Sequence, residues 1–165
     1  MTHLREIILA LADADVDFVI GGGVACVLQG VERFTMDLDI AINLTPENLK
    51  RFVAVMNEQH LTPRVPVRPE ALLNPDAVKM MVKEKNALVF TFVDINNPMR
   101  HVDVFLRDDL SYDVLNRHSE LVDLSGRSVK LVSRAKLLAI KEAIAPPRDK
   151  DQLDIAALRR MIRDE

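Results

Sequence analysis

The sequence predicts a single domain of the α+β or α/β class, with a mixed β-sheet of about four or five strands and helices packed on one side. Segments with helical spacing of apolar residues alternate along the chain with short apolar runs typical of buried strands. With 165 residues and 48% hydrophobic content, the chain is long enough to bury a core of its own. We expect residues 1–110 to form the core of this domain and residues 111–165 a mainly helical C-terminal section packed onto it.

The first elements are a helix, a strand and a glycine turn. Apolar residues recur at helical spacing over 4–14, and residues 16–20 are typical of a short buried strand. Gly21-Gly22-Gly23 then permits a sharp turn and a close approach of the backbone to a ligand. A short helix is expected over 24–29, and Gly30 ends it.

The next segments predict a strand, a helix and a proline-rich connection. A second strand is expected over about 36–43, followed by a helix whose start carries the capping hydroxyl of Thr45 before Pro46. Prolines 63, 66, 69 and 75 deny residues 61–75 a continuous helix, so we expect a loop or broken edge strand at the border of a pocket. A short helix is expected over 76–85.

The remaining chain predicts a hairpin and two helices. Residues 87–95 and 100–106 are typical of two strands that pair through the turn at Asn96-Asn97-Pro98. Two short apolar runs follow, at 120–124 and 128–132, joined through Ser125-Gly126. Helices are expected over 135–144, with Ser133 as the cap, and from about 149 to 162 after Pro146-Pro147.

Charge and composition restrict the partners. A formal net charge of −3 and a pI near 5.8 provide no basic footprint, which argues against long duplex nucleic acid and favours a small nucleotide. The longest apolar stretches are far shorter than a membrane span, and the first residues lack the apolar centre of a signal peptide. We therefore expect a cytoplasmic protein with no membrane partner. The single cysteine, Cys26, lies in an apolar run and is expected to be a core residue.

Three aspartates stand out in apolar surroundings. Asp37 and Asp39 are two residues apart in a predicted strand, so both carboxylates project from one face, about 6 to 7 Å apart. Mg²⁺, or Mn²⁺ in its place, takes such oxygen ligands together with substrate phosphates. Asp103 lies between Val102 and Val104, where it either faces solvent from a half-exposed strand or needs a partner. The upstream pair across a metal would be that partner.

These residues together form a pattern with a known counterpart. The pattern Gly-Gly-x-Ala-x-x-x-x-Gly-x-x-Arg-x-Thr-x-Asp-x-Asp, which runs from Gly22 to Asp39, resembles the nucleotidyltransferase superfamily with its DNA polymerase β-like fold. Within that superfamily it is similar to small bacterial nucleotidyltransferase-like proteins and to toxin subunits of the AbiEii type. The segment 147–154 also resembles the Arg-x-Lys-Asp-x-x-Asp element that closes many of these proteins.

The resemblance implies a site and a reaction. It assigns catalysis and binding of Mg²⁺ or Mn²⁺ to Asp37, Asp39 and Asp103. Nucleotide binding is assigned to Gly22, Gly23, Arg33, Thr35 and Lys150. The implied reaction moves a nucleoside monophosphate from a nucleoside triphosphate to a hydroxyl on a small molecule, a tRNA or a protein. A regulatory nucleotide-binding module without turnover and the toxin component of a toxin–antitoxin pair remain as alternatives.

Several polar residues keep two interpretations. Arg33 can contact a phosphate, or it can pair with Glu32 or with a metal ligand. The mixture of charges around Lys136, Lys141, Arg148 and Lys150 is typical of a solvated helix face, with Lys150 the best candidate for a contact. His101, two residues before Asp103, is more often structural than catalytic in such a position. With only 4% aromatic residues, the sequence names no platform on which a base could stack.

Overall fold

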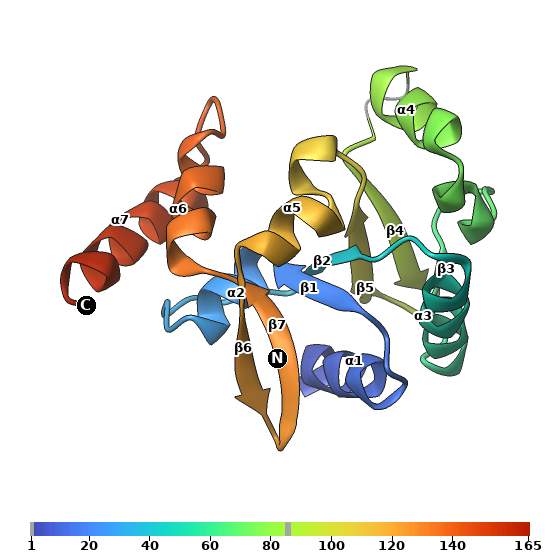
Figure 1. Ribbon diagram of the computed structural model, residues 1–165, viewed down its shortest axis with the longest axis horizontal. Helices are drawn as coiled ribbons and strands as arrows, with labels where there is room; N and C mark the ends of the chain where they lie inside the picture. Colours follow the sequence, from blue (N-terminus) through green and yellow to red (C-terminus); the bar gives the residue numbers. More distant parts are fainter. Residues whose placement is uncertain (1, 85–86) are drawn as a thin grey trace.

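A mixed β-sheet organises the protein, as expected. The computed structural model describes residues 2–84 and 87–165, and within these residues the sheet has seven strands in the order β3-β4-β5-β2-β1-β7-β6 (Figure 1). The expectation of four or five strands was too low, because the apolar runs after residue 118 add a hairpin to the β1 side. The strands are β1 (Phe18–Gly21), β2 (Leu38–Ile42), β3 (Thr62–Pro63), β4 (Val89–Asp94), β5 (Asn97–Phe105), β6 (Ser119–Leu124) and β7 (Arg127–Val132).

Four of the helices form two separate groups (Figure 1). Helices α1 and α3 bury their apolar stripes against one face of the sheet, whereas α6 and α7 lie side by side beyond its β1 side (Figure 1). The end of the helix predicted over 76–85 lies outside the described residues. The helices are α1 (Thr2–Asp13), α2 (Gly22–Leu28), α3 (Pro46–Glu58), α4 (Pro75–Glu84), α5 (Tyr112–Arg117), α6 (Arg134–Glu142) and α7 (Asp149–Arg163), with 3₁₀ turns at Pro69–Leu73 and Asp108–Leu110.

Side-chain caps set the starts of the helices that the sequence predicted best. The Thr45 hydroxyl accepts a hydrogen bond from the Asn48 amide at 3.2 Å, and the Ser133 hydroxyl accepts one from the Lys136 amide at 3.3 Å. Both oxygens satisfy backbone donors that have no partner inside the helix. The predicted starts of α3 and α6 are thereby confirmed to within one residue.

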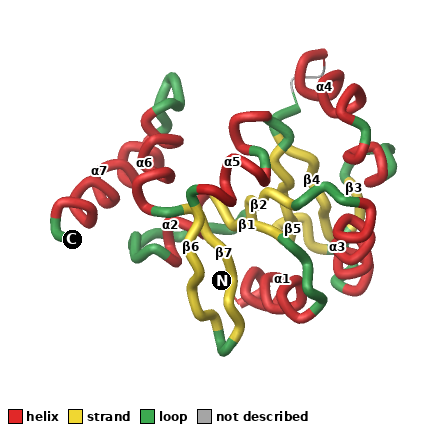
Figure 2. Tube along the Cα trace, viewed as in Figure 1, coloured by secondary structure: helices red, strands yellow, loops and turns green. Residues whose placement is uncertain are grey.

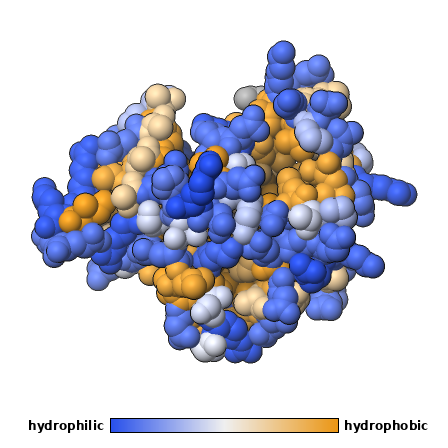
Figure 3. All heavy atoms as spheres, in the orientation of Figure 1, coloured by the Kyte–Doolittle hydropathy of each residue, from blue (hydrophilic) through white to orange (hydrophobic). Residues whose placement is uncertain are grey.

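The middle of the chain pairs as predicted. Strands β4 and β5 form an antiparallel hairpin, and β3 adds two residues to the β4 edge. The proline-rich segment 61–75 is therefore a broken edge strand followed by a 3₁₀ turn, as its prolines predicted. At the opposite edge, apolar atoms reach the surface over β6 (Figure 3), where Leu121 is 68% exposed.

Alternation along the central strands separates an apolar face from a polar one. Leu38 and Ile40 of β2 are fully buried and pair with Val102 and Val104 of β5 on the apolar face. The residues between them project to the opposite face, because successive side chains of a strand alternate. Cys26 is fully buried in the core, as expected, and burial raises the pKa of its thiol to about 11.

Candidate active site

The register of three adjacent strands brings the glycine turn and two of the aspartates together. In the parallel pair β2 and β5, Asp39 lies opposite Asp103, and in the antiparallel pair β1 and β2, Gly21 lies opposite Asp39. Asp37 lies one residue before β2. The strand begins at Leu38, slightly later than the predicted start near residue 36. The two predicted ligands on strands are therefore direct neighbours on one face of the sheet.

Asp39 lies deepest in this group. Burial, together with the charges of Asp103 and Asp37, raises the pKa of its carboxyl to about 6. Gly22, with φ +59°, passes so close that a Cβ there would lie 2.2 Å from Asp39 Oδ2. Among the described residues, no side-chain hydrogen bond or ion pair compensates the Asp39 carboxylate. A cluster of like charges in which the most buried carboxylate has no directly paired cation fits a bound cation.

Asp103 and Asp37 share a third neighbour, His101. The Nε2 atom of His101 lies 3.1 Å from Asp37 Oδ1 and 3.8 Å from Asp103 Oδ2. Donor atoms of these three residues all lie within 4.8 Å of one another, so they can surround one metal ion. The hydroxyl of Thr91 donates to Asp103 Oδ1 at 2.6 Å and orients that carboxylate. His101 was expected to be structural. Its place two residues before Asp103 was the signal that it shares the same face.

The loop over residues 29–37, beside α2 in Figure 2, brings Arg33 and Thr35 to the glycine turn. A Cβ on Gly23 would lie 2.7 Å from Thr35 Oγ1, so this contact also requires glycine. Arg33 Nη1 forms an ion pair with Asp154 Oδ2 at 2.6 Å, a partner that the sequence did not indicate because it lies 121 residues away. The partners proposed there, Glu32 and a metal ligand, do not pair with it.

The segment that resembles the closing element of the family forms a buried ionic network. Lys141 Nζ lies 3.1 Å from Asp151 Oδ1 and 3.1 Å from Asp154 Oδ2, and all three residues are buried. Burial alone would raise the pKa of Asp151, but hydrogen bonds from Arg148 and Lys141 hold it well below its usual range. The expectation of a solvated helix face is therefore wrong for Lys141. The spacing of the two aspartates puts both on the side of α7 that faces α6.

The predicted residues converge on one cleft between the sheet and the C-terminal helices. Its volume is about 1100 Å³. Its lining includes every residue predicted for catalysis or nucleotide binding, namely Gly22, Gly23, Arg33, Thr35, Asp37, Asp39, Asp103 and Lys150. The expectation that segment 61–75 borders the pocket is wrong, because β4 and β5 separate β3 from Asp39 of β2, and no residue of this segment lines the cleft. Phe34, 76% exposed, also lines the cleft and provides the aromatic surface that composition did not reveal.

Comparisons with known proteins give matches only among solved structures, since no family model and no curated protein matches the chain. The lincomycin-bound lincosamide antibiotic adenylyltransferase LnuA matches with a TM-score of 0.63 and 14% identity, over 96% of both chains. The antibiotic-resistance factor ANT(2″)-Ia in complex with adenylyl-2″-tobramycin matches with a TM-score of 0.55 and 15% identity, over 99% of this chain and 96% of that chain. An antigenic nucleotidyltransferase-like protein from Paracoccidioides brasiliensis matches with a TM-score of 0.52 and 18% identity, over 98% of this chain and 77% of that chain.

The chain has the nucleotidyltransferase fold. The resemblance read from the glycines and aspartates is thereby confirmed at the level of the fold. Among the residues that the structure describes, no helix has the length and apolar character needed to cross a membrane.

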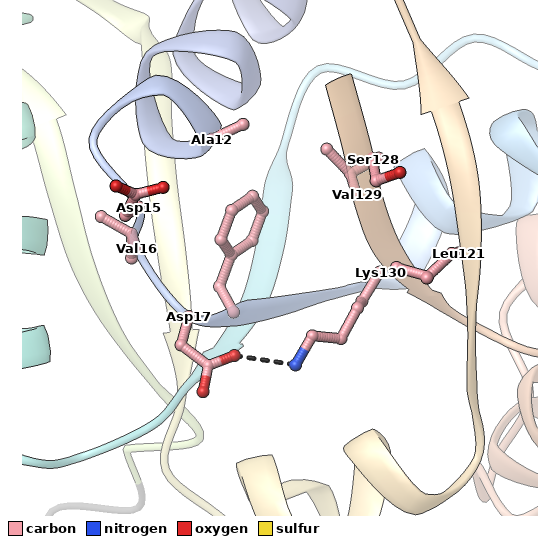
Figure 4. Close-up of a pocket in the computed structure, with 9 residues that line it drawn as sticks. Ala12, Asp15, Val16, Asp17, Leu121, Ser128, Val129 and Lys130 are labelled. Carbon is pink, nitrogen blue, oxygen red and sulfur yellow. Dashed lines mark hydrogen bonds and ion pairs between the residues drawn. The ribbon is translucent and has the colours of Figure 1, made fainter. Parts of the chain in front are cut away.

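The protein also has a smaller cavity of about 270 Å³, between the end of α1, β1 and the β6–β7 hairpin (Figure 4). Lys130 Nζ lies 2.8 Å from Asp17 Oδ1 there, and the Tyr112 hydroxyl donates to the same carboxylate at 2.7 Å. Because these polar groups satisfy one another, they hold the start of β1, β7 and α5 together.

Proposed function

We propose that the protein is a metal-dependent nucleotidyltransferase that moves a nucleoside monophosphate from a nucleoside triphosphate to a hydroxyl acceptor. The observation that carries this proposal is the register of Asp39 opposite Asp103, with Gly22 against the Asp39 carboxylate on the floor of a large cleft. The fold supports it, because LnuA is an adenylyltransferase and ANT(2″)-Ia was captured with an adenylylated antibiotic.

A divalent cation fits the residues present. Asp37, Asp39 and Asp103 would hold it, since their carboxylates supply oxygen ligands and excess negative charge. When bound, Mg²⁺ or Mn²⁺ neutralises charge on the triphosphate and on the pyrophosphate that leaves.

The chain's own groups position the nucleotide. Gly22 and Gly23 carry no side chains, so the triphosphate can approach their backbone closely. The guanidinium of Arg33 is held at the cleft wall by Asp154, where it can contact phosphate oxygens. Lys150, near the start of α7, is a further cation that lines the cleft.

Asp103 is placed to receive a proton. Its Oδ1 accepts a hydrogen bond from the Thr91 hydroxyl, and its Oδ2 is the oxygen that faces His101. As the acceptor hydroxyl loses its proton to Asp103, its oxygen bonds to the α-phosphorus and the bond to pyrophosphate breaks.

A small molecule is the acceptor that the cleft favours over a tRNA or a protein. A cleft of about 1100 Å³ suits a nucleotide and a small acceptor together. The net charge of −3 offers no basic surface for an RNA backbone.

The test is stabilisation by nucleotide. Thermal melts of the wild type are measured with ATP, GTP, CTP and UTP, each with and without Mg²⁺ or Mn²⁺. A nucleotide at about 100 times its Kd adds about 2.7 kcal/mol, or roughly 5 to 11 °C in a domain of this size. The metal-dependent part of this shift is expected to vanish in Asp39→Asn. Asp109→Asn, which removes an exposed carboxylate paired with Arg107 at the cleft rim, is the matched control.

A nucleotide that binds is then tested for turnover. Pyrophosphate release is measured with pools of small hydroxyl-bearing molecules, in the wild type and in Asp103→Asn. Absence of stabilisation by every nucleotide with either metal would contradict the proposal. Stabilisation without release under any acceptor pool would favour the regulatory module without turnover.

A further inference from the structure

The orientation of the His101 ring is fixed from outside the carboxylate cluster. Its Nδ1 atom lies 3.1 Å from the backbone oxygen of Pro98, at the start of the same strand. A carbonyl oxygen only accepts hydrogen bonds, so Nδ1 carries the hydrogen in this contact. In the neutral imidazole the other ring nitrogen, Nε2, then carries the lone pair and directs it toward Asp37 and Asp103.

A lone pair that faces two carboxylates is repelled unless a positive charge lies between them. The separations of 3.1 and 3.8 Å from Nε2 to the two carboxylates suit a shared ion. Neighbouring ligand atoms about 2.1 Å from one cation lie about 3 Å apart. Asp103 is also oriented from outside the cluster, by Thr91. A histidine whose second nitrogen donates to a carbonyl, next to a hydrogen-bonded carboxylate, is the arrangement usual for metal ligands.

We propose that His101 is a ligand of the site's cation through Nε2, and that this nitrogen makes the site prefer a transition-metal ion such as Mn²⁺ over Mg²⁺. The inference rests on the proposed function and refines its metal. Mg²⁺ takes oxygen ligands and keeps its waters. Imidazole nitrogen suits Zn²⁺, Cu²⁺, Fe²⁺ and Ni²⁺ best, and Mn²⁺, although it also favours oxygen ligands, accepts a nitrogen ligand more readily than Mg²⁺ does. Asp37 and Asp103 supply the oxygens on either side of His101.

The test measures metal binding without nucleotide, so it does not depend on turnover. Mn²⁺ is added to the metal-free wild type, and pulsed electron paramagnetic resonance records coupling to a directly bound ¹⁴N. Competition with Mg²⁺ gives the ratio of the two dissociation constants. The same measurements are made on His101→Gln and on His118→Gln, a matched control in which the lost imidazole lies at the end of α5.

The expected result is ¹⁴N coupling in the wild type and in His118→Gln, and its loss in His101→Gln. The affinity for Mn²⁺ is expected to fall at least about tenfold in His101→Gln, since loss of a partner that only orients a ligand already costs about 10- to 100-fold in metal affinity. The preference for Mn²⁺ over Mg²⁺ is expected to fall with it. Bound Mn²⁺ without ¹⁴N coupling in the wild type would overturn the proposal and leave the proposed function standing. Failure of the wild type to bind Mn²⁺ without nucleotide would also overturn the nitrogen ligand, whereas the metal dependence of the proposed function is tested separately by the metal-dependent thermal shift with nucleotide. The wild-type spectrum decides even if His101→Gln fails to fold.

Discussion

Replacing Asp39 by asparagine is expected to stabilise the metal-free protein at neutral pH. Burial and the charges of Asp103 and Asp37 raise the pKa of Asp39 from its ordinary 3.8 to about 6. Between these values the folded chain binds more protons than the unfolded chain, so the free energy of unfolding falls as pH rises through this window. The difference between the two pKa values corresponds to a loss of about 3 kcal/mol, complete above about pH 7.

Asparagine cannot ionise, so the variant escapes this loss. The wild type and Asp39→Asn are expected to differ little near pH 4. Above pH 7 the variant is expected to be up to about 3 kcal/mol more stable, which raises Tm by roughly 6 to 12 °C. The assay is urea unfolding with a chelator present, at several pH values from 4 to 8.

Asp37→Asn is the matched control. The Asp37 side chain is 46% exposed, so solvent screens its charge and the same substitution is expected to change stability less. An Asp39→Asn protein that is no more stable than the wild type at pH 8 would refute the reasoning. So would a stability difference that does not change between pH 4 and pH 8.

Three further perturbations test other parts of the site. Lys141→Met leaves two buried aspartates short of a cation and is expected to lower the free energy of unfolding by about 3 kcal/mol, measured by urea denaturation. Gly22→Ala forces a Cβ onto Asp39 and is expected to destabilise more than Gly126→Ala, which has a similar positive φ but open space around it, so their difference in Tm measures the clash. Phe34→Ala is expected to weaken nucleotide binding about tenfold without changing Tm, because a base would lose its stacking partner. Calorimetry measures the nucleotide affinity. Ile95→Ala is the control, since Ile95 is about equally exposed but lies outside the cleft, and its nucleotide affinity is expected to stay unchanged.

Each of these has an outcome that would count against it. Unchanged stability in Lys141→Met would mean that Arg33 and Arg148 suffice to compensate the carboxylates. Equal losses in the two glycine variants would remove the steric argument. Equal nucleotide affinity in Phe34→Ala would exclude stacking on that ring.

Local signals predicted most of the fold. Apolar periodicity located α1 and β1, and the caps at Thr45 and Ser133 located the starts of α3 and α6. Helix α5 was not predicted, because six residues are too few to show a helical period. The β6–β7 hairpin was recognised only as two apolar runs, since an edge strand with exposed residues lacks the pattern of a buried one.

The candidate site divides in the same way. The shared face of Asp37 and Asp39 follows from their spacing alone, and so does that of His101 and Asp103. The meeting of Asp39 with Asp103 depends on the parallel register of two strands that are distant in sequence, which no local pattern encodes. The burial of Lys141 likewise depends on how α6 and α7 pack, so its charge alone suggested a solvated position.

The parallel pairing of β2 with β5 also makes the site sensitive to whether a length change is odd or even. One residue inserted within β5 before Asp103 would turn its carboxylate into the apolar layer beneath the sheet. Two inserted residues would restore the face but displace the carboxylate by about 7 Å along the strand, out of reach of Asp39. Insertions in the β6–β7 turn or in segment 61–75 would leave the register between β2 and β5 unchanged. We therefore expect the effect of an insertion on activity to depend on whether it shifts the β2–β5 register, and not on whether the inserted residue is exposed.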